Sequence, residues 1–390
     1  MGSRILHIAD LHLGFAHEYL GDAAEGRARE ADLVLDRIAA WLVGSDPPDV
    51  GAVLIAGDLF ENYDPDEALA ERAARALRRI ADAGIAVLTV PGNHDEWTYP
   101  NGVFRRFASS WPGTLVTSVE PEHVATLDLD GLRVEVASCL FHQGRNRPSS
   151  EWKSPFGSPG GPNMKRVGLF HGTVDRIRGK IAEGARAFVL DLDHLAGWGL
   201  DYLALGHIHK RGEFSAGSCV AHYPGPIEGK NFDDPGSPSL SIVDLRGAVA
   251  MIESVDSRPL GIRSREVGRT VIDLTRIADH AHLEREIASL APQTAPPPIA
   301  RVVLRGRAAF PLPIDEIRRA QASRFLHLEI VPDEPGIELG DWESLAAQRS
   351  LEGIFVRRIL EKRAAAPPDQ ARLWTLAAEE GLRALGRGVE

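Results

Sequence analysis

The sequence of 390 residues predicts an α/β fold with a mostly parallel sheet. Three observations favour this class. Short apolar runs alternate with segments of helical period in the N-terminal part, several runs end in loops with carboxylate, amide or imidazole side chains, and Gly or Pro residues mark the transitions. Because the carboxyl ends of parallel strands share one edge of a sheet, the pattern also predicts a site along that edge.

The loop Pro91–Asp95 is central to this prediction, and it follows the apolar run Ile85–Val90. Its last three positions offer an amide, an imidazole and a carboxylate in succession. Gly92 lets the backbone turn sharply before them, so these side chains are able to converge at the carboxyl end of the strand. Taken alone, the Gly-Asn pair also fits an ordinary turn.

Two earlier loops follow buried strands in the same way. Residues Arg4–Ala9 are expected to form a strand that delivers Asp10 and His12, and alternation in an extended segment points these two side chains the same way. The apolar run Val50–Ala56 is a second strand, and it stops at Asp58.

Helices are predicted between these strands. The segment from about Glu30 to Val43 has apolar residues at helical spacing. The next helix ends near Ala83 and begins at Asp64-Pro65-Asp66-Glu67, with Asp64 as N-cap, Pro65 at N1 and Glu67 as a capping-box residue. The alternation of strand and helix is typical of a parallel sheet.

Histidines follow two later strands. Residues 167–170 and 202–205 are predicted strands, and they end in His171 and in the pair His207 and His209. Two antiparallel hairpins are predicted as well: residues 124–129 with 132–137 around the turn Asp130-Gly131, and residues 240–245 with 249–255.

We expect three domains: residues 1–257, a small α+β cap domain over 258–335, and a helical C-terminal segment over 336–390. In the cap domain, strands are expected over 270–274, 300–304 and 325–330 and helices over 279–290 and 313–322. Its histidines His280, His282 and His327 are expected at the surface. The C-terminal segment has two amphipathic helices parted by Pro367-Pro368 and is a candidate docking element for a partner.

Composition excludes several classes of protein. No run of about eighteen apolar residues is present and the N-terminus does not resemble a signal peptide, so we expect a soluble, cytoplasmic protein without a membrane span. Cys139 and Cys219 are too few for a disulfide framework or a Cys-rich zinc site. The net charge of -11 argues mildly against a protein that coats nucleic acid by itself, but it is compatible with a nuclease.

Eight side chains at predicted strand ends suit metal binding or catalysis beside a metal: Asp10, His12, Asp58, Asn93, His94, His171, His207 and His209. Oxygen and imidazole ligands without thiolate favour Mn²⁺, Fe or Zn²⁺. Two ions need a shared ligand, and Asp58, which stands alone between the other groups, is the predicted bridge. The alternative, that each histidine is a satisfied core or surface residue, does not explain why all eight fall on strand ends.

These residues form motifs that resemble, in order, those of the calcineurin-like metallophosphoesterases. The motifs are Asp10-x-His12, Gly57-Asp58, Gly92-Asn93-His94-Asp95, His171-Gly172 and Gly206-His207-x-His209. The strings ILHIADLHLG, AGDLFE and GHIHK resemble more narrowly the DNA-repair exonuclease branch, which contains the SbcD-type nuclease subunit of the SbcCD complex. The resemblance covers residues 4–245 and implies a four-layer α/β/β/α metallophosphoesterase sandwich; for residues 260–390 it rests on layout alone.

The resemblance implies two divalent ions and a role for each residue. One ion is held by Asp10, His12 and His209, a second by Asn93, His171 and His207, and Asp58 bridges them. Mn²⁺ is expected, with Mg²⁺, Fe or Zn²⁺ as alternatives. His94 then stays free of metal and acts as general acid toward the departing oxygen. Asp95 is a candidate to orient His94, although adjacent residues in a loop often diverge.

One position departs from the family pattern. Archaeal and eukaryotic members carry a histidine three residues after the bridging aspartate, where this chain has Glu61. A carboxylate there is expected to repel a phosphate. The bacterial subunit is also acidic at this place, so the difference indicates the subfamily.

Basic residues near the predicted site favour a polymeric substrate. Residues 143–180 contain eight basic side chains against two acidic ones, and we interpret them as a DNA-facing rim, with a solvated basic surface as the alternative. The eight are Arg145, Arg147, Lys153, Lys165, Arg166, Arg176, Arg178 and Lys180. Lys210 and Arg211 follow His209, and Arg105 and Arg106 follow the His94 loop.

The predicted function is a metal-dependent DNA exonuclease or endonuclease in DNA repair. Its expected partners are DNA and an SMC-type coiled-coil ATPase, with a homodimer as the alternative use of the C-terminal helices and no membrane. A phosphatase or cyclic-nucleotide phosphodiesterase is the alternative enzyme. From another class, the alternative is a DNA-end-binding scaffold for a motor ATPase with weak hydrolysis.

Overall fold

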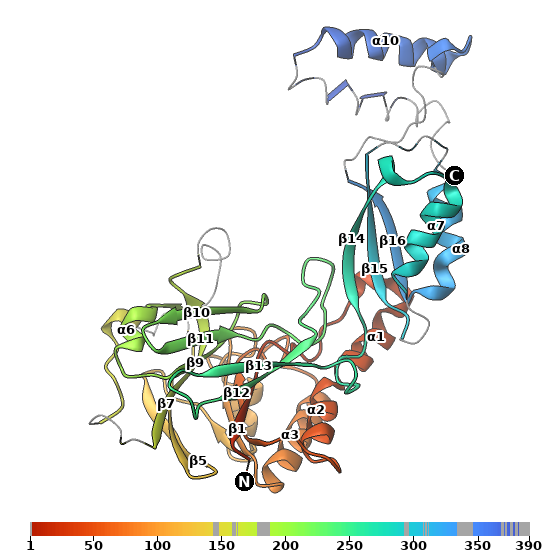
Figure 1. Cartoon of the computed structure of the whole chain (residues 1–390). Helices are drawn as coiled ribbons and strands as arrows, with labels where there is room; N and C mark the ends of the chain where they lie inside the picture. Colours follow the sequence, from red (N-terminus) through yellow and green to blue (C-terminus); the bar gives the residue numbers. More distant parts are fainter. Residues whose placement is uncertain are drawn as a thin grey trace. The chain divides into compact units, whose positions relative to one another are not determined.

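A computed structural model shows how the chain folds (Figure 1). It describes residues 2–142, 148–157, 163–177, 188–291, 296–306, 312–333 and 346–367, together with residues 161, 308, 310, 370, 373, 374, 377, 378 and 381. The chain divides into two compact units, Met1–Val267 and Gly268–Glu390. The finer division into domains 1–257, 258–335 and 336–390 stays a prediction.

The first sheet of the first unit has six strands in the order β13-β12-β1-β2-β3-β4. They are β13 (Met251–Asp256), β12 (Ser239–Asp244), β1 (Arg4–Ile8), β2 (Val50–Ala56), β3 (Ala86–Val90) and β4 (Thr114–Leu115). Strands β1 to β4 run parallel, and β12 and β13 form the predicted closing hairpin. Every residue of β2 is buried because both faces of this central strand are covered, and its sequence is therefore continuously apolar.

The second sheet has the order β10-β11-β9-β7-β6-β5, with β8 paired to β7. Its strands are β10 (Gly212–Ala216), β11 (Cys219–Tyr223), β9 (Tyr202–Gly206), β7 (Met164–Val174), β6 (Leu132–Ser138), β5 (Glu122–Leu129) and β8 (Phe188–Leu190). The predicted hairpin between β5 and β6 is confirmed. Its turn residues Asp130 and Gly131 have φ of 53° and 82°, the left-handed pair that a two-residue hairpin turn needs.

Helices cover the outer face of each sheet. They are α1 (Ala24–Ala31), α2 (Val34–Leu42), α3 (Glu67–Asp82), α4 (Val103–Phe107) and α6 (Leu192–Ala196), with 3-10 turns at Glu18–Ala23 and Ser149–Glu151. One core lies between α2, α3 and the first sheet, a second lies between the two sheets, and a third lies between the second sheet and α6. This order of layers confirms the predicted α/β/β/α sandwich.

Alternation along β1 connects two of these cores. Leu6 and Ile8 belong to the core under the helices, whereas Ile5 belongs to the core between the sheets. Both faces of the strand are thus anchored, and the residues after Ile8 are held at the edge of the sandwich. The structure thereby explains why the polar loop begins where the apolar run ends.

The predicted start of the helix after Asp58 is wrong by two residues. The N-cap of α3 is Asp66, whose carboxylate accepts from the backbone N–H groups of Ala68 and Leu69 at 2.9 and 3.3 Å. Asp64 instead forms an ion pair with Arg106 at 3.1 Å. The carboxylate of Asp64 therefore does not cap the first N–H groups of α3.

The predicted end of the strand before His171 is also wrong. Strand β7 continues to Val174 because β8 pairs with Gly172, Thr173 and Val174. His171 therefore lies inside a fully buried stretch of strand rather than in a loop. The sequence did not indicate β8 as a partner, because this strand is only three residues long.

The second unit contains a three-stranded sheet in the order β14-β15-β16. Its elements are β14 (Val267–Asp273), a 3-10 turn (Leu274–Arg276), α7 (His280–Ser289), β15 (Ile299–Arg305), α8 (Ile314–Gln321), a second 3-10 turn (Ala322–Arg324), β16 (His327–Pro332) and α10 (Leu351–Ala365). The alternation of strands and helices agrees with the predicted α+β module, whose apolar core includes residues of β15, β16, α7 and α8. The second predicted C-terminal helix, with Leu376 and Leu385, falls largely outside the described residues. No helix in the described part of the chain is long and apolar enough to span a membrane.

Candidate metal centre

The structure brings together the predicted site residues from loops and strands of both sheets. A first set consists of Asp10 and His12 after β1 and His209 after β9, and their ligand atoms lie within 4.8 Å of one another. The imidazole atoms His12 Nε2 and His209 Nε2 are 3.0 Å apart. Residues almost two hundred positions apart therefore meet because β1 and β9 belong to facing sheets.

A second set lies beside the first. Asp58, His171 and His207 place their ligand atoms within 4.8 Å of one another. Asn93 completes this set, because its Oδ1 is 3.0 Å from His171 Nε2 and 2.9 Å from His207 Nδ1. These four residues follow or lie within the parallel strands β2, β3, β7 and β9.

Asp58 lies between the two sets. Its Oδ2 is 3.7 Å from His12 Nε2 in the first set and 3.3 Å from His171 Nε2 in the second. Its Oδ1 accepts from the backbone N–H of His94 at 2.9 Å, which fixes the carboxylate. Among the seven predicted metal ligands, Asp58 is therefore the residue whose carboxylate lies close enough to serve both sets.

The backbone at these residues is strained. Four non-glycine residues of the two sets have positive φ: Asp10 (56°), His12 (48°), Asp58 (49°) and His207 (98°). Such conformations persist only where surrounding contacts determine them, and they gather at functional sites. Here the N–H groups of Asp10 and His12 donate to the carbonyls of Gly57 and Asp58 at 3.1 and 3.0 Å, so the loops after β1 and β2 hold each other.

Two glycines of the motifs are required by close approach. A Cβ on Gly92 would lie 2.1 Å from Asp58 Oδ1, and a Cβ on Gly206 would lie 1.9 Å from the carbonyl oxygen of Ala56. The Ala56 carbonyl oxygen and the fixed Asp58 carboxylate are unable to move away from such a Cβ. The Gly-Asn-His and Gly-His-x-His motifs thus bring the backbone of β3 and β9 against the loop that carries Asp58.

The donor atoms fit divalent cations. His209 Nδ1 is hydrogen-bonded to Asp234 Oδ2 at 2.5 Å, and His12 Nδ1 lies 2.9 Å from Glu61 Oε2, a close contact to a carboxylate without the angle of a hydrogen bond. With both rings protonated on Nδ1, the two Nε2 lone pairs face each other at 3.0 Å, an arrangement that a cation between them stabilises. Asp10 Oδ2 is buried and has no hydrogen-bond partner among the described residues, which a bound cation would also correct.

The pKa values of the second set show that nearby carboxylates favour a positive charge on His171 but not on His207. Burial acts to raise the pKa of Asp58, but His171 and His12 outweigh it and hold that pKa well below its usual range. Burial lowers the pKa of His171, whereas the carboxylates of Asp58 and Asp10 raise it, to about 9. Burial lowers the pKa of His207 to about 3, so this ring is neutral at physiological pH, as a metal ligand must be.

His94 differs from the other histidines of the site. Its Nδ1–H donates to the backbone carbonyl of Glu61 at 2.9 Å, which leaves Nε2 to face away from that loop. Its side chain is 39% exposed, while those of His12 and His171 are almost fully buried. The ring lies 4.7 Å from that of His12, so a partly exposed imidazole stands beside the first set.

The suggestion that Asp95 orients His94 is wrong. The two oxygens of Asp95 accept from the backbone N–H groups of Gly92 and Phe60 at 2.7 and 3.0 Å. Burial and the nearby Asp58 raise the pKa of Asp95 to about 7. Asp95 therefore ties the loop after β3 to the loop after β2, and the carbonyl of Glu61 orients His94.

Glu61 has a role that the sequence did not indicate. Its carboxylate lies 2.9 Å from His12 Nδ1 and 3.0 Å from Lys230 Nζ. Burial acts to raise its pKa, but His12 and Lys230 lower it to about 2. The ammonium of Lys230 balances the charge of Glu61, and the expectation that Glu61 repels a phosphate stays a prediction. Lys230 and Asp234 were missed as well, since no motif connects them to Glu61 and His209, the residues that they contact.

The predicted basic rim is only partly supported. Among its described members, Lys165 pairs with Asp201 at 2.9 Å, Arg166 with Glu135 at 3.4 Å, and Arg176 with Asp193 at 2.6 Å. Side chains already paired in the fold contribute less to binding phosphates. Arg145, Arg147, Arg178 and Lys180 lie outside the described residues. Lys210, beside His209, is exposed.

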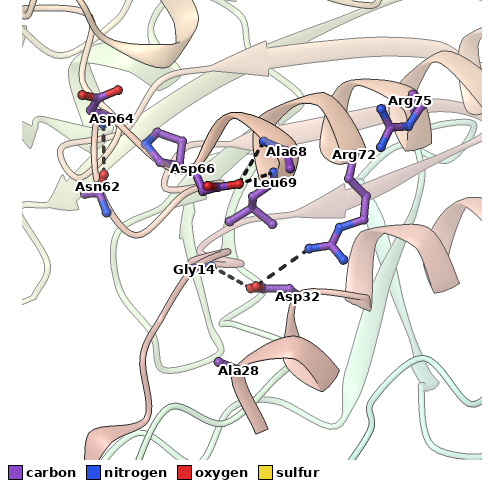
Figure 2. Close-up of a pocket in the computed structure, with 11 residues that line it drawn as sticks. Gly14, Ala28, Asp32, Asn62, Asp64, Asp66, Ala68, Leu69, Arg72 and Arg75 are labelled. Carbon is purple, nitrogen blue, oxygen red and sulfur yellow. Dashed lines mark hydrogen bonds and ion pairs between the residues drawn. The ribbon is translucent and has the colours of Figure 1, made fainter. Parts of the chain in front are cut away.

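A cavity of about 510 Å³ lies next to the loops of the site (Figure 2). It is lined by Gly14 and Asn62, which follow the His12 and Glu61 segments, and by residues of α1 and α3. Asp32 in this cavity accepts from Gly14 N–H at 2.7 Å and lies 4.0 Å from Arg72 (Figure 2). None of the eight predicted site residues lines the cavity. The hydrogen bond between Gly14 and Asp32 in its wall instead holds the loop after β1.

Comparisons with known proteins agree with this geometry. The calcineurin-like phosphoesterase family matches residues 3–211. The uncharacterized metallophosphoesterase YhaO of Bacillus subtilis is 27% identical over 252 residues, which are 62% of this chain and 57% of that protein. The DNA double-strand break repair protein Mre11 of Aeropyrum pernix is 28% identical over 263 residues, 65% of this chain and 60% of that protein. The chain thus spans less than two thirds of the length of these relatives.

Among solved structures, the phosphopantetheinyl hydrolase PptH of Mycobacterium tuberculosis aligns with 58% of this chain and 91% of its own length. The sequence identity is 14% and the TM-score is 0.34.

Proposed function

The chain belongs to the calcineurin-like phosphoesterase family, and from this premise we propose that it is a two-metal-dependent DNA exonuclease or endonuclease of DNA repair. The observation that carries the proposal is the convergence of two ligand sets on Asp58, with a partly exposed His94 beside them. Several relatives bear the name DNA double-strand break repair protein Mre11, which favours DNA as the substrate.

In this proposal Asp10, His12 and His209 hold one divalent ion, Asn93, His171 and His207 hold the second, and Asp58 is shared. Mn²⁺ is the expected metal. Bound ions would supply a water of lowered pKa and stabilise charge on the phosphoryl oxygens. The residues of the chain fix much of the ligand geometry, because the imidazoles of His12, His171 and His209 each have a close contact at Nδ1.

His94 is the proposed general acid. Since its Nδ1–H is held by the carbonyl of Glu61, the Nε2 atom is the one that presents a proton to the departing oxygen. Its backbone N–H donates to Asp58, so the acid and the shared ligand keep a constant distance. No metal-ligand role is needed for this ring in the scheme.

The proposed partners are DNA and an SMC-type coiled-coil ATPase in the cytoplasm, with a homodimer as the alternative. Helix α10 supports a docking role, because Leu351 and Ile354 on it are 65% and 48% exposed. Removal of residues 342–390 should end co-purification with such an ATPase and leave cleavage of short single strands intact.

A nuclease assay tests the proposal. The purified chain should cleave single- or double-stranded DNA with Mn²⁺ and lose this activity in the His94→Asn variant, which keeps the metal ligands. DNA affinity should fall as salt rises, with a slope of log K against log salt of about -0.7 to -0.9 for each phosphate contact.

A phosphatase or cyclic-nucleotide phosphodiesterase is the second candidate. The paired state of Lys165, Arg166 and Arg176 favours it, since these charges are already used within the fold. Brisk hydrolysis of a phosphomonoester or cyclic nucleotide, with no cleavage of DNA and no response to salt, would replace the nuclease proposal by this one.

A further inference from the structure

The two ligand sets differ in what stands behind their imidazoles. In the first set, both histidines are backed by carboxylates: Glu61 Oε2 is 2.9 Å from His12 Nδ1, and Asp234 Oδ2 is 2.5 Å from His209 Nδ1. Both carboxylates are partly shielded from solvent, with side chains 25% and 16% exposed. Each imidazole therefore has an anionic partner on the nitrogen that faces away from the set.

The second set has a neutral partner instead. His171 Nδ1–H donates to the backbone carbonyl of Ala56 at 2.8 Å, and the nearby Asp10 Oδ1 is 3.9 Å away, beyond hydrogen-bonding distance. His207 uses its Nδ1 to approach Asn93, and among the described residues no carboxylate contact to its Nε2 is found. The amide of Asn93 is neutral as well, whereas Asp10 brings a charge to the first set.

A carboxylate behind an imidazole increases the electron density of the ring and fixes its tautomer, and both effects strengthen the bond to a cation. A backbone carbonyl fixes the tautomer but adds no net charge. The first set thus has three anionic groups of its own, Asp10, Glu61 and Asp234, in addition to the shared Asp58. The second set has the shared one, and Asp10 Oδ1 reaches it through the backbone N–H of His207 at 2.8 Å rather than through a hydrogen bond to an imidazole.

We propose that Glu61 and Asp234 are positioning residues that make the Asp10–His12–His209 site the tighter of the two, so that it fills first and the Asn93–His171–His207 site exchanges its ion. This inference rests on the proposed two-metal function and deepens it. It also gives Glu61, the departure from the family pattern, a defined purpose.

Lys230 limits the effect of Glu61. Its ammonium lies 3.0 Å from Glu61 Oε2 and also over the ring of Phe15, with Nζ 4.7 Å from the centroid. The same short segment carries Asp234, whose carbonyl accepts from the N–H of Lys230 at 2.9 Å. The loop of residues 230–234 therefore contacts His209 directly, through Asp234, and His12 indirectly, through Lys230 and Glu61.

This loop is anchored independently of the metal sites. Just before Lys230, Glu228 forms an ion pair at 2.9 Å with Arg27, whose side chain is fully buried. Glu228 also accepts from the N–H and hydroxyl of Ser264 at 2.8 and 3.0 Å. Substitutions of Glu61, Lys230 or Asp234 leave this anchor in place, so their effects on metal binding are separable from folding of the loop.

The test is a titration of the full-length, metal-free protein with Mn²⁺, followed by electron paramagnetic resonance of the free ion and by calorimetry. Wild type should show a tight and a loose class. Glu61→Gln and Asp234→Asn should each weaken the tight class by about 10- to 100-fold and leave the loose class unchanged. Lys230→Met, which releases the full charge of Glu61 toward His12, should tighten it.

Asp32→Asn is the matched control. It removes one carboxylate beside the same loop, but Asp32 contacts Gly14 and Arg72 rather than an imidazole (Figure 2). It should change neither class. A single class in wild type, weakening of the loose class by Glu61→Gln, or equal effects of Asp32→Asn would overturn the proposal.

A second measurement needs no variant. In nuclear magnetic resonance spectra of the metal-free protein, substoichiometric Zn²⁺ should shift the side-chain signals of His12 and His209 before those of His171 and His207. The reverse order would refute the inference even if a variant fails to fold. A protein that binds metal in this order but does not cleave DNA would contradict the proposed function and leave the inference standing.

Discussion

Histidines of the two units occupy opposite environments. In the first unit, His12 and His171 are buried and meet carboxylates from other loops. In the second unit, His280, His282 and His327 are partly exposed and lie 3.6, 3.5 and 3.2 Å from Glu284, Glu286 and Glu329 of their own helix or strand. The sequence interpretation overlooked that two of these pairs have i,i+4 spacing.

The difference teaches which contacts identify a site. A histidine and a glutamate one helical turn apart meet on many surface helices, because the helix itself brings them together. His12, Asp58 and His171 meet only through the packing of three strands from two sheets. Convergence of distant segments at a buried point, and not the residue type, therefore distinguishes the candidate metal centre.

The largest expected effect tests the shared ligand. Asp58→Ala should abolish binding of both ions, because its carboxylate is the group within reach of both sets, whereas His12→Ala should weaken one site preferentially. Metal content of the purified variants measures the effect. Retention of two ions by Asp58→Ala would show that the sets are independent.

The next effect separates chemistry from metal binding. His94→Gln should keep the metal content and lower turnover of DNA by about 10²- to 10⁴-fold, the usual contribution of a positioned general acid. Bis-nitrophenyl phosphate, whose leaving group needs little protonation, should lose less. Equal losses on both substrates would argue against an acid role for His94.

A smaller effect concerns the pH dependence of the metal-free protein. The pKa of His171 is raised to about 9 by neighbouring carboxylates, so its stabilising contribution is complete below its ordinary value of 6.5 and is lost as the pH rises through 9. The advantage in thermal midpoint of metal-free wild type over His171→Asn should therefore shrink between pH 6.5 and 9. Thermal unfolding in the presence of a chelator measures it, and an advantage that grows with pH would contradict the assignment.

The smallest effect belongs to the second unit. His282→Ala should change the free energy of unfolding by no more than about 1 kcal/mol, because its ion-pair partner Glu286 is an exposed i,i+4 neighbour and its hydrogen bond from the Ala278 N–H is exposed as well. Metal content and turnover should equal those of wild type. A loss of metal in this variant would break the contrast between the two units.

Much of the fold follows from local sequence patterns. The strand before Asp10, the strand Val50–Ala56 and the hairpin turn Asp130-Gly131 are where the periodicity and turn residues predict them. These features are local because backbone alternation and turn geometry depend on a few consecutive residues. Asp10 and His12 are an exception, because they follow the strand with left-handed φ of 56° and 48°, so the extended alternation predicted for them is wrong.

Other features depend on segments that are far apart in the chain. Only the tertiary structure decided that Glu61 lies between His12 and Lys230, that Asp234 backs His209, and that Asp95 ties two loops together. It also decided that Lys165 and Arg166 are paired within the fold.

The physical reason is the range of the interactions. A strand end or a turn is selected by its own few residues, whereas the partner of a charge is whichever group the packing of distant strands brings within about 4 Å. The sequence by itself therefore determined which residue types stand at the edge of the sheets. The tertiary structure determined which of them face each other, and hence how the charges around the two candidate metal sites are balanced.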